Sequence, residues 1–192
     1  FVGPSGDAIR LMGDKVAARS AAHAAGVPIV PGSLGRVDGI DAARHILIDT
    51  GFPVMIKAAA GGGGRGIRIA ANLAEFEQAF PQAEAEALAA FGDGGLYMEK
   101  VITKARHIEV QILADGADAI HCFERECSLQ RRRQKVWEEA PSRALSPRLR
   151  DELCSSAVRR ARAVNYSGAG TVEYLYDEDA DRFYFIEMNT RI

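Results

Sequence analysis

The stretch KAAAGGGGRG, residues 57–66, places a lysine and a run of glycines directly after the apolar, strand-like residues 52–56. Glycine within a strand costs about 0.5 to 1 kcal/mol relative to alanine, so a run of four requires a compensating role. Backbone N–H groups freed of side chains can converge on an anion, and a lysine that ends the preceding strand can neutralise phosphate charge. A P-loop has another order, because its lysine follows the glycines at a helix start. A flexible surface loop is the alternative, and these residues alone leave both interpretations open.

The composition predicts a globular domain and limits its partners. The chain has 192 residues, 47% of them hydrophobic, and a formal net charge of -2, which gives no general attraction to nucleic acids. The sequence has no apolar stretch of the roughly 20 residues that span a bilayer, so we expect no membrane partner either. Cys122, Cys127 and Cys154 form no C-x-x-C pair, which favours reduced thiols. We expect a cytoplasmic protein, or one of the mitochondrial matrix in a eukaryote.

Interspersed helical and strand-like segments predict an α+β fold with mixed and antiparallel sheets. Helices are expected at residues 7–25 with a second cap at Asp14, 41–50, 72–91 with an interruption near Pro81, and 146–164. Strands are expected at residues 52–59, 66–70, 95–102, 106–115, 119–124, 170–176 and 183–189. Residues 30–102 could then form a lobe of their own, and the rest of the chain a second lobe that this one interrupts.

The segment TVEYLYDEDADRFYFIEMNTR, residues 171–191, predicts a hairpin with acidic residues on one face. Side chains two residues apart on a strand share a face, so Glu187, Asn189 and Arg191 point the same way. If the loop has five or seven residues, Glu173 lies directly opposite Glu187. Opposed like charges destabilise a strand pair, and a hard divalent cation between carboxylates and an amide oxygen would remove that repulsion. A solvated hairpin face is the alternative.

Two further segments carry weaker signals. In LYMEKVI, residues 96–102, Glu99 could accept a hydrogen bond from an adenine amino group, or it could form an exposed pair with Lys100 at a strand end. The segment CSLQRRRQKVWEEAPS, residues 127–142, is a charged loop as a bare pattern. Beside a triphosphate and a metal ion, its cations could hold a second, smaller anion.

Several segments together resemble the biotin carboxylase component of biotin-dependent carboxylases, within the ATP-grasp superfamily. The matching segments are FPVMIKAAAGGGGRG (52–66), LYMEKVI (96–102), RHIEVQILAD (106–115), ERECSLQRRRQKVWEEAPS (124–142), YSGAGTVEY (166–174) and FYFIEMNTRI (183–192). The resemblance implies an ATP-grasp fold with two lobes, truncated at both ends. Residues 1–29 and 103–192 would form the larger lobe, which is incomplete C-terminally. Residues 30–102 would form a small lid lobe with the glycine-rich loop.

The resemblance also implies roles for individual residues. ATP contacts would come from Lys15, Lys57, Gly63, Gly64, Glu99, Lys100, Ile102, His107, Gln130 and Arg133. Mg²⁺ or Mn²⁺ would be held by Glu173, Glu187 and Asn189. Lys135 and Arg191 would bind bicarbonate as catalytic residues, with Arg191 the main one.

The implied activity is carboxylation of biotin on a biotin carboxyl carrier protein domain, driven by ATP and bicarbonate through carboxyphosphate. A carboxyltransferase component would act next, and the full-length protein could form a homodimer. Two departures affect individual sites, because Arg133 replaces a histidine of many relatives and Ala60 replaces a glycine. The chain also ends at Ile192, before the segment in which relatives place a glutamate base, so we expect this fragment alone to be impaired or inactive.

Two alternative functions stay open at this point. Another ATP-grasp ligase, such as a carbamoyl phosphate synthetase-like enzyme or a carboxylate-amine ligase, would share the lid and the paired glutamates. A non-catalytic nucleotide-binding module would keep Lys57 and the glycines but would have no need of Lys135 or Arg191.

Overall fold

The computed structural model describes residues 3–60, 67–132 and 134–191, and its chain separates into two compact units. One unit consists of Phe1–Ile29 and Thr103–Ile192, and the other of Val30–Ile102. Within the described ranges, no helix has both the length and the apolar character needed to cross a bilayer.

The first unit is built on a four-stranded antiparallel sheet with the order β5-β4-β8-β9. Its strands are β4 (Ala105–Asp115), β5 (Ala119–Glu126), β8 (Ser167–Asp177) and β9 (Arg182–Asn189). Its helices are α1 (Gly6–Gly13), α2 (Lys15–Ala24) and α5 (Pro147–Ala163), and a short hairpin comprises β6 (Gln130–Arg131) and β7 (Gln134–Lys135). The expected cap between the first two helices is confirmed, because the Asp14 carboxylate accepts the N–H groups of Val16 and Ala17 at 2.9 and 3.0 Å.

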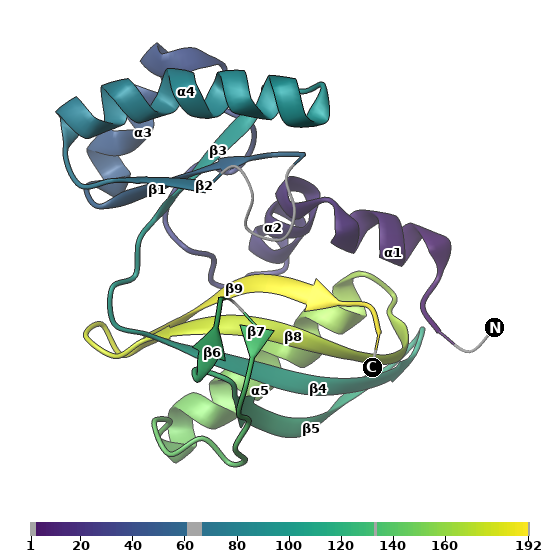
Figure 1. Ribbon diagram of the computed structural model, residues 1–192. Coiled ribbons are helices and arrows are strands. Elements are labelled where there is room, and N and C mark those ends of the chain that lie inside the picture. Colours follow the sequence, from purple (N-terminus) through teal and green to yellow (C-terminus); the bar gives the residue numbers. More distant parts are fainter. Residues whose placement is uncertain (1–2, 61–66, 133, 192) are drawn as a thin grey trace. The chain divides into compact units, whose positions relative to one another are not determined.

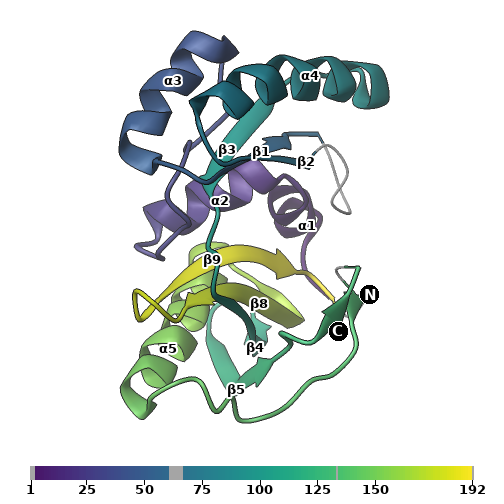
Figure 2. The same ribbon diagram turned by 60° about the vertical axis from the view of Figure 1, so that its left-hand side comes forward.

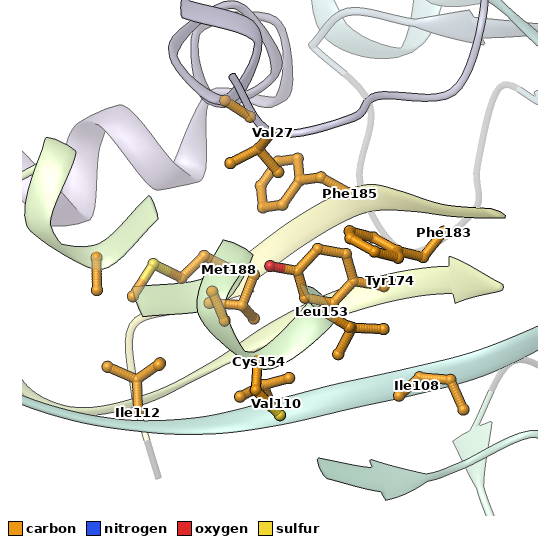
Figure 3. Packing of buried hydrophobic residues seen from close by; sticks show 14 of the residues in the cluster. Val27, Ile108, Val110, Ile112, Leu153, Cys154, Tyr174, Phe183, Phe185 and Met188 are labelled. Atoms are coloured by element: carbon orange, nitrogen blue, oxygen red, sulfur yellow. The ribbon is translucent and has the colours of Figure 1, made fainter. Parts of the chain in front are cut away.

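One face of this sheet forms the core of the unit. Residues of β4, β8 and β9 alternate between two faces, and those on the core face pack against α5, α1 and α2. Figure 3 shows the core with Tyr174 and Phe185 at its centre, their ring centroids 6.4 Å apart. Figures 1 and 2 agree that the sheet lies between α5 and the β6–β7 hairpin. The face turned away from α5 is therefore the one that can carry chemistry.

The terminal hairpin reaches its expected register by an unexpected route. Glu173 lies directly opposite Glu187, as the hairpin prediction required. The expected odd loop is wrong, because the register Asp177↔Arg182 leaves a four-residue loop between the strands. An irregularity next to the Glu173↔Glu187 pair, where Ile186 is the extra residue, shifts the pairing by one position. The bulge at Ile186, and not an odd loop length, therefore places Glu173 opposite Glu187.

The second unit is a three-stranded antiparallel sheet of order β2-β1-β3, covered by two helices. The strands are β1 (Val54–Ala58), β2 (Ile67–Ala70) and β3 (Leu96–Lys100), and the helices are α3 (Gly39–Thr50) and α4 (Leu73–Phe91). The strands β1 and β2, which flank the glycine-rich stretch, pair with each other, as expected for a hairpin-like unit. Gly51, at φ 65°, follows the last residue of α3 as the expected stop.

The expected interruption of the helix near Pro81 is wrong. The helix α4 is continuous from Leu73 to Phe91 and contains Pro81 in its interior. Proline inside a helix removes one hydrogen bond and costs about 3 kcal/mol. The buried face continues on both sides of it, with Phe76 and Phe80 before it and Ala83 after it. Burial of this face against the sheet outweighs the local cost.

Candidate functional site

A row of charged side chains crosses the whole sheet of the first unit on the face opposite α5. Arg125 pairs with Glu109, Glu109 with Glu173, and Glu173 with Glu187, so four adjacent strands each contribute one residue. Three of these four are carboxylates, and opposed like charges destabilise neighbouring strands. Glu109 and Glu173 are also buried, at 2% and 6% exposure. This arrangement requires cations between the carboxylates.

Glu173 is the most heavily contacted member of the row. Its Oε2 lies 2.9 Å from Nε2 of His107, while its Oε1 accepts hydrogen bonds from Lys135 Nζ at 2.9 Å and from Asn189 Nδ2 at 2.7 Å. Burial by itself would raise the pKa of Glu173, but the bonds and charges of His107 and Lys135 outweigh burial and lower it to about 2. The carboxylate is therefore ionised at neutral pH, and the solvated hairpin face considered above is excluded.

Lys135 bridges two of the three carboxylates. Its ammonium group contacts Glu109 as well as Glu173. Burial would lower the pKa of this amine, but the hydrogen bonds to the two carboxylates raise it above its ordinary value. The segment 127–142 is consequently more than a charged surface loop, because its hairpin sends Lys135 onto the polar face of the sheet.

Glu109 belongs to this site although sequence reasoning did not single it out. It contacts Lys135, and its Oε1 accepts a hydrogen bond from Nε of Arg125 at 2.7 Å. Arg125 also donates to Oε1 of Gln111 at 3.1 Å. A usable signal was present in RHIEVQ, where Glu109 shares a strand face with His107 inside an apolar segment. Its importance depends on the neighbouring strands, which that segment does not specify.

Oxygen donors on this face fit a hard divalent cation. Glu173 and Glu187 are opposed across two strands, and Asn189 is two residues further along the strand of Glu187. Within the described part of the chain, Glu187 has no ion-pair partner, so one carboxylate of the row is uncompensated. The amide nitrogen of Asn189 faces Glu173, and its carbonyl oxygen would be the metal-ligating atom.

A second group of three potential ligands lies beside the row but is poorly suited to a metal ion. Glu109, Cys127 and Glu138 have ligand atoms within 4.8 Å of one another. Burial, and next the charge of Glu109, raise the pKa of the Cys127 thiol to about 12. A protonated thiol is a weak ligand, and Glu109 already contacts Lys135 and Arg125. We therefore interpret Glu109, Cys127 and Glu138 as structural residues of the site and not as metal ligands.

In the second unit, the two predicted nucleotide contacts Lys57 and Glu99 bind each other. The Lys57 ammonium contacts the Glu99 carboxylate and lies 5.6 Å from the centre of the Tyr97 ring. The Glu99 side chain is 13% exposed, which argues against an exposed pair at a strand end. The Lys100 side chain donates to the Phe52 carbonyl oxygen at 2.5 Å. For Lys57 or Glu99 to contact a ligand, the ion pair between them would first have to break.

The remaining predicted site residues lie at several places along the chain. Lys15 is the first residue of α2, and Ile102 follows β3 at the end of the second unit. Gln130 donates from Nε2 to the Cys127 carbonyl oxygen at 3.0 Å, and Arg191 follows β9. Three predicted residues, Gly63, Gly64 and Arg133, lie outside the described ranges.

A family model described as "Carbamoyl-phosphate synthase L chain, ATP binding domain" matches residues 14–192. The chain belongs to this family. Among curated members, it is 53% identical to the biotin carboxylase of Nostoc and 52% identical to the chloroplastic biotin carboxylase of Arabidopsis thaliana. Each alignment covers 100% of this chain, but only 43% and 36% of the respective relative. The chain thus spans less than half the length of the relatives that it matches.

Solved structures from the family superpose closely on this chain. A complex of biotin carboxylase from Campylobacter jejuni with β-γ-ATP has a TM-score of 0.91 and 50% identity, covering 100% of this chain and 43% of that one. The biotin carboxylase domain of the Hydrogenobacter thermophilus 2-oxoglutarate carboxylase, solved as a dimer with MgADP, ADP and bicarbonate, has a TM-score of 0.90 and 47% identity, covering 100% and 42%. The predicted biotin carboxylase resemblance and ATP-grasp fold are confirmed.

Proposed function

We propose that this chain forms the ATP- and metal-binding part of a ligase that carboxylates biotin on a carrier protein domain, using ATP and bicarbonate. The observation that carries the proposal is the row Glu109, Glu173 and Glu187, bridged by Lys135 on one face of the sheet. Relatives about 50% identical across the whole chain are biotin carboxylases, which supports the same chemistry.

Glu173, Glu187 and Asn189 would hold Mg²⁺, or Mn²⁺ in its place. The bound ion would neutralise charge on the phosphate oxygens of ATP. Lys135 has two carboxylate partners, so it can keep Glu109 while Glu173 turns to a metal ligand. The ammonium group would then face an incoming anion without losing its anchor.

The reaction would proceed through carboxyphosphate. A bicarbonate oxygen attacks the γ-phosphorus of ATP, the bond to the β-phosphate oxygen breaks, and ADP leaves. Carboxyphosphate then breaks into carbon dioxide and phosphate, the released phosphate accepts the proton of the ureido N–H of biotin, and that nitrogen attacks the carbon dioxide. Lys135 and Arg191 would bind the bicarbonate, and their positive charges would stabilise the negative charge that develops on its oxygens.

The nucleotide contacts are proposed residue by residue. Lys15 and Lys57 would contact phosphates, Gly63 and Gly64 would cover them, and Glu99 would accept from the adenine amino group. Lys100 and Ile102 would frame the base, while His107, Gln130 and Arg133 would complete the contacts. A closed lid would exclude water from the labile carboxyphosphate.

The proposed partners follow from this reaction. Biotin would arrive covalently bound to a biotin carboxyl carrier protein domain, and a carboxyltransferase component would pass the carboxyl group to its acceptor. The full-length protein would act in the cytoplasm, or in the mitochondrial matrix of a eukaryote, and a homodimer is its proposed state. Neither a nucleic acid nor a membrane is a proposed partner.

The test uses the full-length protein that contains this chain. We expect ATP hydrolysis that depends on both bicarbonate and biotin. Substituting Arg191→Ala should lower carboxylation about 100- to 1,000-fold, as loss of one charge-stabilising donor does, and leave nucleotide affinity largely intact. Arg159→Ala, on the exposed side of α5, is the matched control and should have little effect. If carboxylation survives in the Arg191 variant, its assigned role is wrong.

The family description also keeps a carbamoyl phosphate synthetase-like ligase as the second candidate. Such an enzyme would also use ATP, but ammonia or an amine would attack the acyl phosphate. ATP turnover by the full-length protein that is stimulated by ammonia and not by biotin would favour that candidate over the first.

A further inference from the structure

The loop that carries Lys135 is closed at its base by the last residue of β5. Glu126 and Glu139 exchange two backbone hydrogen bonds, from Glu126 N–H to Glu139 O at 2.8 Å and from Glu139 N–H to Glu126 O at 3.1 Å. The chain between them leaves the sheet, forms the β6–β7 hairpin and returns. The position of Lys135 therefore depends on how firmly this base is held.

The carboxylate of Glu126 fastens both arms of the loop to the sheet. Its Oε1 accepts hydrogen bonds from Ser128 Oγ and Arg106 Nη1, both at 2.9 Å. Its Oε2 accepts one from Ser142 Oγ at 2.7 Å. Ser128 belongs to the outgoing arm, Ser142 follows the returning arm, and Arg106 belongs to β4. One buried side chain thus ties three segments together.

The carboxylate is built to stay ionised in this place. Only 5% of the Glu126 side chain is exposed. Burial would raise its pKa, but the hydrogen bonds from Ser142, Arg106 and Ser128 outweigh burial and lower it. Charge-assisted hydrogen bonds of this kind are stronger than neutral ones. The base of the loop is therefore held by strong contacts.

Ser128 extends the connection to the predicted nucleotide contact on β4. Its Oγ accepts the backbone N–H of His107 at 3.0 Å while it donates to Glu126. His107 in turn contacts Glu173 through its ring. Glu126 is thus connected to His107 through the Ser128 side chain. It also closes the base of the loop that carries Lys135, and both His107 and Lys135 contact Glu173.

We propose that Glu126 is a positioning residue for Lys135: it fixes the base of the loop so that the ammonium group meets Glu109 and Glu173. The catalytic reading of this role rests on the proposed function, in which Lys135 binds bicarbonate. Glu126 is not one of the residues proposed to bind substrate or metal, and it acts through the loop and through Ser128.

Glu124 offers a matched control two residues earlier on β5. Its side chain is also buried, and its Oε1 accepts hydrogen bonds from Arg150 Nε at 2.7 Å and from the Ser142 N–H at 3.1 Å. These contacts lie beyond the returning arm of the loop. Glu124→Gln therefore removes a similarly buried charge that has no contact to Ser128 or Arg106 and shares only Ser142 with Glu126.

The experiment compares Glu126→Gln, Ser128→Ala and Glu124→Gln in the full-length protein. For the first two, we expect faster amide hydrogen exchange in residues 127–139 and a KM for bicarbonate raised about 10- to 100-fold, as small misplacements of a binding group produce. The KM for MgATP should also rise, because Gln130 and Arg133 are proposed nucleotide contacts within the loop, but it should rise less, because Lys15 and Lys57 lie outside it. Glu124→Gln should change both quantities much less, because Ser128 and Arg106 keep their carboxylate partner, although it can lower stability.

Hydrogen exchange in residues 127–139 and the KM for bicarbonate together distinguish a failure of the positioning role from a failure of the proposed function. If Glu126→Gln leaves exchange in residues 127–139 unchanged, Glu126 does not hold the loop and the proposal fails, whatever the activity. If exchange rises but the bicarbonate KM does not, the positioning role fails while the proposed function stands. A wild-type protein without bicarbonate-dependent turnover would refute the proposed function, and the exchange data would still decide whether Glu126 holds the loop. Should Glu126→Gln fail to fold, Ser128→Ala carries both measurements.

Discussion

The two faces of the four-stranded sheet use the same strands for opposite purposes. On the face toward α5, Val110, Val172 and Tyr174 are fully buried and pack into the core. On the other face, Glu109 and Glu173 alternate with them along the same strands and contact Lys135. The hydrophobic effect accounts for one face, while paired charges account for the other.

This comparison shows why a buried charged row can persist in a folded chain. Removing one partner of a buried ion pair costs about 3 to 5 kcal/mol, whereas apolar replacement of the whole pair is often neutral or stabilising. The row is thus a poor source of stability compared with the core face. Its arrangement is better explained by a function than by folding.

The largest stability effect is expected on the core face. Phe185→Ala should lower the free energy of unfolding by about 3 to 5 kcal/mol, because Phe185 is 1% exposed and packs edge-on to Tyr174. Denaturant unfolding measures this loss. Tyr184→Ala, on the preceding residue and the other face, is the control and should cost clearly less. Equal losses for the two variants would abolish the distinction between the faces.

A substitution on the polar face should mainly affect function. Glu173→Gln is expected to weaken metal-dependent ATP turnover by more than about 100-fold, since even outer-shell changes at metal sites cost 10- to 100-fold. Calorimetric titration with MgATP and steady-state turnover of the full-length protein measure the effect. Glu152→Gln, which changes an exposed acid on α5, should leave both unchanged. Normal metal dependence in the Glu173 variant would remove this residue from the metal site.

The smallest expected effect is on the pH dependence of stability. It sharpens the comparison because Glu126 is a carboxylate that pairs with Ile108, a residue of the core face. Its folded pKa is lowered by its hydrogen bonds despite burial. Its contribution to stability is therefore complete above the unfolded pKa of about 4.3 and is lost as the pH falls through the lower folded value. Unfolding free energies measured across this range should fall more steeply for the wild type than for Glu126→Gln. Parallel curves would show that this carboxylate is not selectively stabilised.

Local signals predicted most of the fold. The Asp14 cap and the glycine stop at Gly51 depend on the residues next to them, and the structure confirms both. The helix interruption expected near Pro81 was wrong because the cost of proline is local, whereas the compensating burial of Phe76 and Phe80 depends on a sheet formed elsewhere in the chain. Propensity is a weak prior wherever tertiary burial is this large.

The candidate site was predicted in part. Alternation along one strand placed Glu187 and Asn189 on a common face, and the opposition of Glu173 to Glu187 was correct even though the loop length was not. Glu109 was missed because its role depends on pairing with Glu173, 64 positions further along the chain, and on Lys135 arriving from a loop. Assignments of individual nucleotide, metal and bicarbonate contacts stay predictions.

The amino-acid sequence by itself determined most helices and strands, though not the β6–β7 hairpin, together with the Asp14 cap, the Gly51 stop and the alternation of polar with apolar side chains, since these depend on neighbours a few residues apart. Only the tertiary structure decided that Arg125, Glu109, Glu173 and Glu187 form one row and that Lys135 closes it. The physical reason is that strand register, the bulge at Ile186 and the path of the loop are set by packing and hydrogen bonds between distant segments, which no local pattern encodes.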